Sequence, residues 1–127
     1  MLSICKQFEF HAAHHLPDHE GKCKQIHGHT YRLEIEVGGP KQSSGPERGM
    51  IVDFGKIKEV VHRCIIDELD HTDLNLRWAN PTAEEMVDSF SYQLYEAFFR
   101  QFGTDVVLLR ISLWETSDSC ATWRADL

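Results

Sequence analysis

No apolar run in this sequence approaches the roughly 20 residues that a membrane-spanning helix requires. The N-terminal stretch MLSICKQFEF also lacks the basic segment followed by an apolar segment that marks a secretory signal peptide. The chain has no internal repeat and no low-complexity segment. These absences predict a protein that has no membrane partner and stays in the cytoplasm.

Blocks of lysine and arginine are missing as well. The chain carries 13 basic and 20 acidic side chains, which gives a formal net charge of −7. Proteins that bind nucleic acid need basic clusters to displace counterions from phosphates, so we expect no nucleic-acid partner. An anionic substrate would require a local cation here, and eight histidines make a bound metal ion a reasonable candidate.

The four cysteines form no CxxC pair, and the chain shows no secretory context, so a disulfide framework is not expected. Cys5, Cys64 and Cys120 fall in segments with strand or helix periodicity, which predicts small buried side chains. Cys23 differs because it lies in the polar stretch EGKCKQ, where packing gives no reason for a thiol. The neighbouring lysines favour its reactive thiolate form.

The length of 127 residues predicts one domain that spans residues 1–127. The order of the elements is ββααββ, with short connections that favour antiparallel pairing. We therefore predict an α+β fold, with an antiparallel four-stranded sheet and two helices on one face. The predicted strands cover residues 2–10, 31–37, 105–115 and about 120–125, and the segment MIVDF at 50–54 is predicted as a short strand or strand end.

Both helices have recognisable limits. Apolar residues recur at helical spacing from about Phe54 to Leu69. The second helix begins at a T-x-x-E capping box formed by Thr82 and Glu85, and it ends at Gly103. The Gly/Pro/Ser-rich residues before the first helix, 38–50, predict an exposed loop.

A carboxylate is predicted on the buried face of the third strand. Glu115 follows the parity of the apolar residues in residues 105–115, unless the strand ends at Trp114. On an apolar face, this carboxylate should be paired, ligated or bound to a polar ligand. The residues predicted to face the core are Val107, Leu109, Ile111 and Leu113.

The histidines suggest a metal site. His27 and His29 lie two residues apart at the start of a strand, so their side chains project from the same face. Catalytic zinc typically takes three protein ligands and keeps one open position, so a third ligand must come from elsewhere. Paired surface histidines without a metal are the alternative. The preceding segment FHAAHHLPDH supplies further candidates, namely His11, His14, His15 and His19.

A second group of ionisable residues lies between the helices, in ELDHTDLN. Asp70 and His71 are adjacent there, and such a pair can form an acid/base relay if it meets a thiol in space. Aspartate and histidine are also common in loops that end helices, so spacing alone leaves this role open.

Six segments together resemble a known family: FHAAHHLP, CKQIHGHTY, IVDF, LDHTDLN, NPTAE and WET. In this order they are similar to the 6-pyruvoyltetrahydropterin synthase family, and most like its 6-carboxytetrahydropterin synthase branch. The resemblance implies the T-fold, in which three ββααββ subunits close their sheets into a twelve-stranded barrel and two trimers form a homohexamer. The branch rests on the C-x3-HGH spacing, because pyruvoyl enzymes usually have a longer gap.

The resemblance implies a zinc site and its ligands. By position, Zn2+ would be bound by His14, His27 and His29. His15 could compete with His14 if the end of the strand shifts by one residue.

The resemblance also implies catalytic and substrate-binding residues. Cys23 matches the catalytic cysteine, and Asp70 and His71 match an acid/base pair that reaches the site from a neighbouring subunit. Glu115 matches the glutamate that anchors the pterin ring. Thr82, in NPTAE, is assigned to substrate binding.

The implied enzyme is a lyase of queuosine biosynthesis. It would convert the small-molecule substrate 7,8-dihydroneopterin triphosphate to 6-carboxy-5,6,7,8-tetrahydropterin and release acetaldehyde and triphosphate. One alternative inside the family is the pyruvoyl enzyme of biopterin synthesis. Another is a variant associated with folate supply, in which glutamate replaces the cysteine; Cys23 disfavours it, although Glu20 lies three residues earlier. Two alternatives outside the family are a cupin-like metalloprotein, suggested by HGHTYRLE, and a non-catalytic protein in which Cys23 is a fourth, structural zinc ligand.

Overall fold

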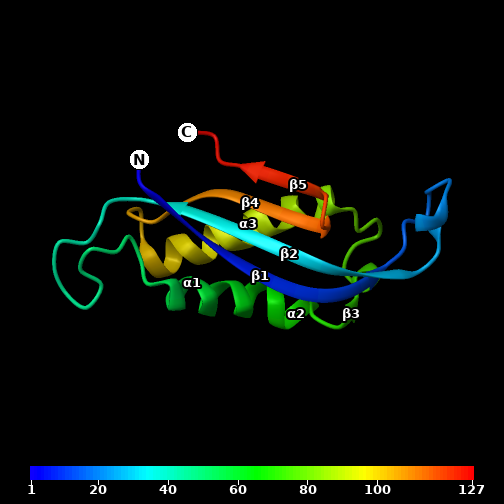
Figure 1. The fold of residues 1–127 in the computed structure, drawn as a ribbon, viewed down its shortest axis with the longest axis horizontal. Coiled ribbons are helices and arrows are strands. Elements are labelled where there is room, and N and C mark those ends of the chain that lie inside the picture. Colours follow the sequence, from blue (N-terminus) through cyan, green and yellow to red (C-terminus); the bar gives the residue numbers. More distant parts are fainter.

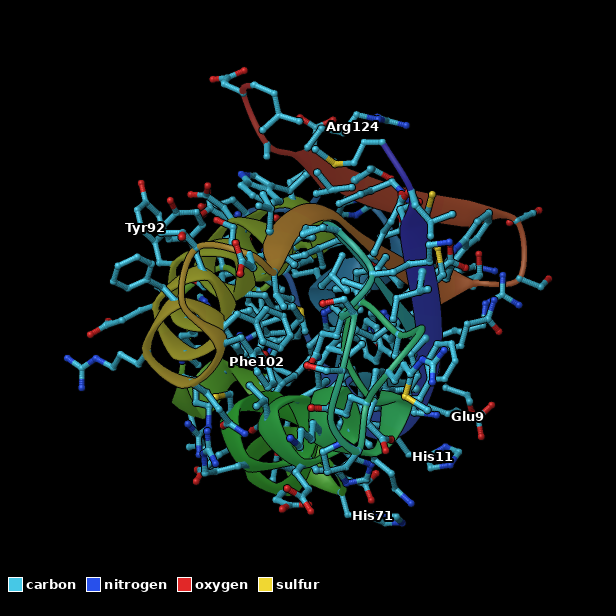
Figure 2. The ribbon with its side chains drawn as sticks, turned by 90° about the vertical axis from the view of Figure 1, so that its left-hand side faces the viewer. Glu9, His11, His71, Tyr92, Phe102 and Arg124 are labelled. Carbon is cyan, nitrogen blue, oxygen red and sulfur yellow. The ribbon has the colours of Figure 1, made fainter.

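The computed structural model describes residues 1–127, which form a sheet with helices on one face (Figures 1 and 2). The sheet has the strand order β3-β1-β2-β4-β5, and its four long strands pair antiparallel. The α+β prediction is confirmed. The strands are β1 (Ser3–His14), β2 (His27–Gly38), β3 (Thr72–Asp73), β4 (Val107–Thr116) and β5 (Ser119–Arg124).

The short strand β3 was not predicted. It pairs in parallel with β1, where Ala12 lies beside Thr72 and Ala13 lies beside Asp73. A strand of two residues shows no alternation in sequence, so only the neighbouring strand reveals it. It adds a fifth strand at the edge formed by β1.

The predicted helix from about Phe54 to Leu69 is one continuous helical run with a π-helix in its middle. Asp53 begins this run, because its Oδ1 accepts a hydrogen bond from the N–H of Gly55 at 2.7 Å. The segments are α1 (Phe54–Val61), the π-helix η2 (His62–Ile66) and α2 (Asp67–Leu69).

The long helix α3 (Ala83–Phe102) has the predicted limits. The Oγ1 of Thr82 accepts a hydrogen bond from the N–H of Glu85 at 3.1 Å, as expected for an N-cap. At the other end, Gly103 has a φ of 72°, a conformation that glycine adopts without strain. No helix is long and apolar enough to cross a membrane.

A bulge changes which residues of β4 face the core. Val37 pairs with Leu108 while Glu36 pairs with Arg110, so Leu109 is the extra residue. Leu108 is therefore buried, and the prediction that Leu109 faces the core is wrong. The simple alternation of polar and apolar residues does not show where a bulge lies.

The predictions of a strand at MIVDF and of buried side chains at Cys5 and Cys120 are also wrong. MIVDF forms no strand, although Ile51 and Val52 are buried in the core. Cys5 and Cys120 are exposed, because they follow the polar face of their strands, whereas Cys64 is half-buried against the core.

The core lies between the sheet and the helices. The buried residues of β1 continue along the strand to its C-terminal end. Alternate residues of β1 face the helices, including Phe10, whose ring stacks on that of Tyr31 at 4.9 Å. His14 continues this alternation and is fully buried. At the same end lies the short 3-10 helix η1 (Lys22–Lys24), at the opposite end from loop 39–53 (Figure 1).

Candidate metal and catalytic site

His14 occupies the last position of β1 and faces the helix layer. Its Nδ1–H donates a hydrogen bond to the main-chain carbonyl of Pro81 at 2.8 Å. This bond places the proton on Nδ1 and leaves the Nε2 lone pair free for a ligand.

His27 and His29 begin β2 and project to the same face, as predicted from their spacing. The Nδ1–H of His27 donates to the carbonyl of Gln25 at 2.7 Å. Strand pairing sets His27 directly beside His14. The main chain therefore orients a second imidazole in the same way as the first.

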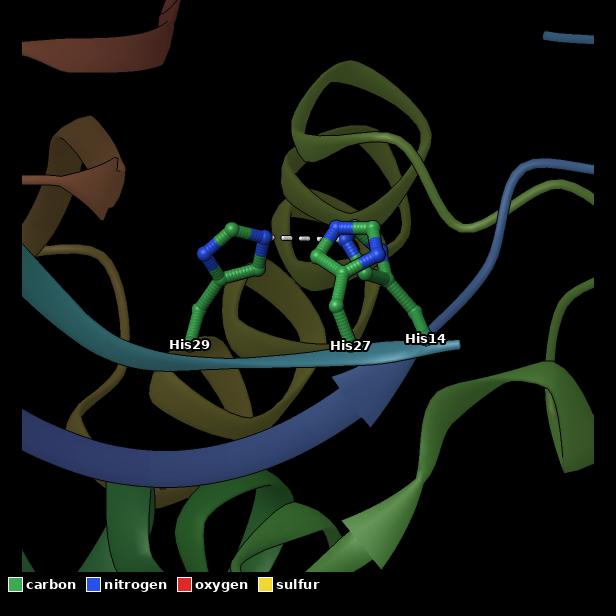
Figure 3. Close-up of side chains that lie close together, drawn as sticks. All are labelled: His14, His27 and His29. Atoms are coloured by element: carbon green, nitrogen blue, oxygen red, sulfur yellow. Dashed lines mark hydrogen bonds between the residues drawn. The ribbon is translucent and has the colours of Figure 1, made fainter. Parts of the chain in front are cut away.

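The three imidazoles form a compact triangle (Figure 3). Their ring centroids lie 4.7, 4.8 and 4.9 Å apart, and one ligand nitrogen from each lies within 4.8 Å of the others. The Nε2 atoms of His14 and His29 are only 3.1 Å apart. Three converging nitrogen donors, two of them with Nδ1–H bound to carbonyls, fit a divalent metal ion such as zinc.

The protonation of His29 also suits a metal ligand. Burial lowers the pKa of His29, the neighbouring His14 and His27 lower it further, and the carboxylate of Glu115 opposes them. The net shift is downward, so the imidazole is neutral at ordinary pH. Neutral imidazole is the form that binds metals.

Glu115 lies beside this triangle. Its Oε1 is 3.3 Å from the Nε2 of His29, and its side chain is 27% exposed. β4 continues past Trp114 to Thr116, so Glu115, two residues after the buried Leu113, keeps the inward parity that the sequence predicted. The pairing of β4 with β5 is irregular at this point. The carboxylate borders a cavity of about 650 Å³ between the start of α3 and β5, where Val87 and Trp123 supply apolar surface.

Cys23 lies in η1 and is half-buried. Its carbonyl accepts a hydrogen bond from the N–H of Leu16 at 2.7 Å, which ties η1 to the chain just after β1. The group of converging ligand atoms consists of the three histidines and does not include its thiol. This geometry argues against a closed four-ligand site.

Asp70 and His71 form a separate cluster with His11. The rings of His11 and His71 lie near each other, with centroids 5.6 Å apart (Figure 2). The Oδ1 of Asp70 accepts the N–H of His11 at 2.9 Å, and its Oδ2 lies 3.0 Å from the Nδ1 of His71. The main-chain hydrogen bond from His11, followed by the contact with His71, lowers the pKa of Asp70. The carboxylate is therefore ionised and orients the imidazole of His71.

This cluster does not join the histidine triangle of its own chain. His11 is three residues before His14, so its side chain lies on the opposite face of β1. The side chain of His71 is 76% exposed, and its backbone φ of 61° is rare for a residue other than glycine. The sequence had left open whether the pair meets the thiol, and within one chain it contacts His11 instead.

The remaining predicted residues, His15 and Thr82, lie next to the triangle rather than in it. Thr82 follows Pro81, whose carbonyl holds His14, and its hydroxyl caps α3. The main chain of His15 is bound by the side chain of Asn75, through two hydrogen bonds of 2.9 Å.

Four residues that support the triangle or the end of β1 were missed from the sequence. Main-chain carbonyls such as those of Gln25 and Pro81 carry no sequence signal. Asn75 lies inside LDHTDLN but has no spacing that links it to a histidine. Tyr31 is a fully buried core residue whose hydroxyl lies 3.5 Å from the Nδ1 of His14, and burial, followed by Glu115, raises the pKa of Tyr31.

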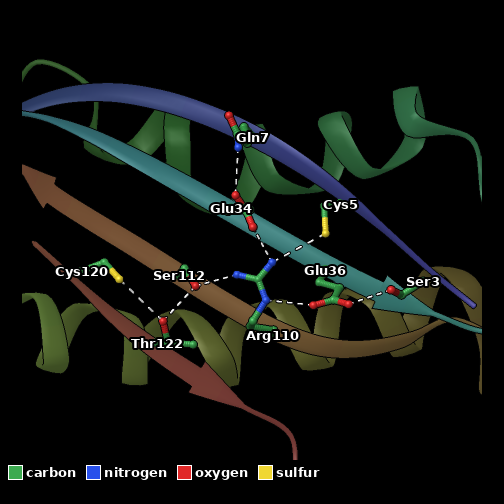
Figure 4. Close-up of polar contacts among 9 residues, drawn as sticks. All are labelled: Ser3, Cys5, Gln7, Glu34, Glu36, Arg110, Ser112, Cys120 and Thr122. Carbon is green, nitrogen blue, oxygen red and sulfur yellow. Dashed lines mark hydrogen bonds and ion pairs between the residues drawn. The ribbon is translucent and has the colours of Figure 1, made fainter. Parts of the chain in front are cut away.

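A different polar cluster lies on the exposed face of the sheet, opposite the helices (Figure 4). Arg110 forms ion pairs with Glu34 and Glu36, and its Nη1 donates to the Oγ of Ser112 at 2.7 Å. Burial alone would lower the pKa of Arg110, but the two carboxylates raise it overall. Every charge in this cluster is paired, so it is a structural network.

Comparison with known proteins places these features in a family. The model of the 6-pyruvoyl tetrahydropterin synthase family matches residues 3–126. A 6-carboxy-5,6,7,8-tetrahydropterin synthase of Haemophilus influenzae is 44% identical over 71 residues, 56% of this chain and 50% of that relative. The match thus spans about half the length of that relative. The protein of the same name from Synechocystis sp. is 39% identical over 100 residues, 76% of this chain and 78% of that one.

Two further proteins complete the comparison. A dihydroneopterin monophosphate aldolase of Pyrococcus furiosus is 36% identical over 115 residues, 91% of this chain and 90% of that relative. The structure of Caenorhabditis elegans 6-pyruvoyl tetrahydropterin synthase superposes with a TM-score of 0.77 over 98% of this chain and 96% of that one. At 22% identity, this likeness concerns the fold alone. The match over residues 3–126 shows that the chain belongs to the 6-pyruvoyl tetrahydropterin synthase family.

Proposed function

We propose that this chain is a zinc-dependent lyase that converts 7,8-dihydroneopterin triphosphate and one water molecule to 6-carboxy-5,6,7,8-tetrahydropterin, acetaldehyde and triphosphate. The observation that carries the proposal is the triangle of His14, His27 and His29 with Glu115 3.3 Å from one of its nitrogens. The relatives named 6-carboxy-5,6,7,8-tetrahydropterin synthase support the branch. The reaction would belong to queuosine biosynthesis in the cytoplasm.

Three converging imidazoles match the ligand set of catalytic zinc, which keeps a fourth position open. A zinc ion held by these three histidines would supply Lewis-acid polarisation of the side-chain hydroxyls of the substrate, which would lower the pKa of the adjacent O–H and C–H groups. The carbonyls of Pro81 and Gln25 support the arrangement by fixing two of the rings.

The chain's own residues would orient the substrate and move its protons. Glu115 accepts hydrogen bonds from the N–H edge of the pterin, a strong interaction for an ionised carboxylate. Cys23, in η1, removes a proton from the substrate side chain. Thr82 contributes a hydroxyl to substrate binding at the start of α3.

Asp70 and His71 would serve the site of a neighbouring subunit. Their exposure and their position beside His11, away from the triangle of the same chain, support this arrangement. Both edges of the sheet also suit assembly: β5 is an edge strand, and β3 covers β1 only at Ala12 and Ala13. Closure of three such sheets into a twelve-stranded barrel would remove these edges, and two trimers would form the hexamer.

Incubation of the zinc-loaded protein with 7,8-dihydroneopterin triphosphate, followed by mass analysis of the pterin, tests the proposal. A carboxylated tetrahydropterin, with acetaldehyde and triphosphate, is the expected result. A pyruvoyl product would move the chain to the biopterin branch. Absence of turnover in zinc-loaded protein would refute the proposal and favour the non-catalytic zinc alternative.

The second candidate is an aldolase that acts on a dihydroneopterin phosphate. Identity of 36% over 91% of this chain with the Pyrococcus furiosus aldolase favours it. The same assay with dihydroneopterin monophosphate distinguishes the two, because an aldolase would cleave this side chain without eliminating triphosphate. The cupin-like alternative is wrong, since the chain belongs to another family and carries long helices.

A further inference from the structure

The residues that follow Asp70 form main-chain hydrogen bonds with the end of β1. The main-chain N–H of His71 donates to the carbonyl of His11, and β3 then pairs with Ala12 and Ala13. This ladder of hydrogen bonds would end here, because β3 has only two residues. Asn75 extends it by one further step.

The side chain of Asn75 binds both main-chain groups of His15. Its Oδ1 accepts the N–H of His15, and its Nδ2 donates to the carbonyl of His15, each at 2.9 Å. The amide therefore acts as a neighbouring strand would act. Asn75 is itself held by Asp73, whose Oδ1 accepts its N–H at 3.0 Å.

These contacts hold the chain on both sides of His14. Pairing at Ala13 sets the residue before it, and Asn75 sets the residue after it. Successive side chains of an extended segment point to opposite faces, so a slip of one residue would exchange His14 and His15. Both are histidines, so either imidazole could bind the metal if the end of the strand shifted.

We propose that Asn75 is a positioning residue that selects His14, and not His15, as the third metal ligand. This inference rests on the proposed metal site. It adds a role for a residue that lies outside the triangle. The amide fixes the peptide that follows His14, and this keeps His14 against the carbonyl of Pro81. Loss of the amide frees the strand end and lets His15 compete.

The test compares zinc affinity and cobalt(II) spectra of purified variants. We expect Asn75→Ala to weaken zinc binding about 10-fold or more, as other losses of outer-shell support do, and to alter the visible absorption of bound cobalt. His15→Ala in the wild-type background should change neither. In the Asn75→Ala background, His15→Ala should change the cobalt spectrum again, because a competing ligand is then removed. Asn80→Ala is the matched control, since Asn80 is exposed and its side chain has no hydrogen bond.

Other outcomes would overturn the proposal. A lower melting temperature with unchanged zinc affinity and cobalt spectrum would make Asn75 merely structural. An unchanged cobalt spectrum when His15→Ala is added to Asn75→Ala would refute ligand selection. If Asn75→Ala does not fold, Asn75→Asp takes its place, because it keeps the acceptor for the N–H of His15 and loses only the donor. None of these measurements requires turnover, so a catalytically inactive protein would refute the proposed reaction and leave this inference standing.

Discussion

Two of the three imidazoles of the triangle are held by a main-chain partner at Nδ1. The carbonyls of Pro81 and Gln25 hold the Nδ1 protons of His14 and His27, so both rings present Nε2. Such outer partners set the tautomer and raise the basicity of a ligand. The site is therefore built by main-chain geometry as much as by the histidines.

The thiol of Cys23 can be tested separately from the metal. We expect Cys23→Ala to keep about one zinc per chain and its oligomeric state, while turnover falls by about 10²-fold to 10⁴-fold, as for loss of a general base. The geometric reason is that its thiol is not among the converging ligand atoms. Metal analysis and the pterin assay measure the two effects.

His27→Ala is the control for Cys23→Ala, because it should lose zinc affinity whatever the role of the cysteine. A Cys23→Ala protein that loses zinc and stability together would show that the thiol is a ligand. The structural-zinc alternative would then replace the catalytic one.

Glu115 can be tested by a substitution that keeps its shape. Glu115→Gln should raise the KM for the pterin about 10-fold to 100-fold, because a hydrogen bond to a charged acceptor is lost. Zinc content should stay the same, since Glu115 raises the pKa of His29 and its loss leaves that imidazole still more neutral. Steady-state kinetics and metal analysis check both points, and an unchanged KM would contradict the pterin-anchoring role.

At the scale of elements, Thr82 begins α3 and adjoins the residue that holds His14. Thr82→Ala should cost about 1 kcal/mol of stability through loss of the N-cap, and Thr82→Ser should restore most of it. Urea unfolding measures this effect. If Thr82 also binds substrate, the alanine variant should show a higher KM at unchanged zinc content; an unchanged KM would limit Thr82 to capping.

The Arg110 network should stabilise the sheet in a pH-dependent way. The hydrogen bond from Arg110 lowers the pKa of Glu34, and those from Ser3 and Arg110 lower that of Glu36. A carboxyl whose pKa is lower in the folded than in the unfolded protein stabilises the folded protein when the pH is above the pKa of the unfolded state. This stabilisation is lost as the pH falls through the pKa of the folded state. Arg110→Met should therefore cost about 1–2 kcal/mol at pH 7 and less at about pH 3.

Urea unfolding at the two pH values tests this prediction. Arg100→Met is the control, because the ion pair of Arg100 with Glu96 is exposed and should contribute little at either pH. An equal loss at both pH values for Arg110→Met would mean that packing, rather than charge, explains its contribution.

At the scale of the whole molecule, the separation of Asp70 and His71 from the triangle predicts complementation between subunits. Cys23→Ala chains and His71→Ala chains should each be inactive, and refolding them together should recover part of the activity. Mixed oligomers would contain some sites with an intact cysteine and an intact His71 from different chains. The pterin assay on the mixture measures the recovery.

The control is a mixture of His71→Ala chains with chains that carry both substitutions. No site in this mixture can contain His71, so no activity should return. Complete absence of recovery in the first mixture, with exchange of subunits confirmed by native mass spectrometry, would count against a shared site.

The sequence by itself determined the features that depend on local interactions. The capping box at Thr82 and the helical spacing from Phe54 to Leu69 predicted both helices, because caps and apolar periodicity act within a few turns. Strand alternation placed His27 and His29 on one face, since side chains in a strand repeat every two residues. The resemblance of six motifs indicated the family.

Only the tertiary structure decided the features that depend on strand register and main-chain partners. It placed His14 rather than His15 in the triangle, because pairing of β1 with β2 and the contacts of Asn75 set the end of the strand. It also held Asp70 beside His11, on the other face of β1. The contacts that hold both placements do not follow from spacing, because they join residues up to 60 positions apart.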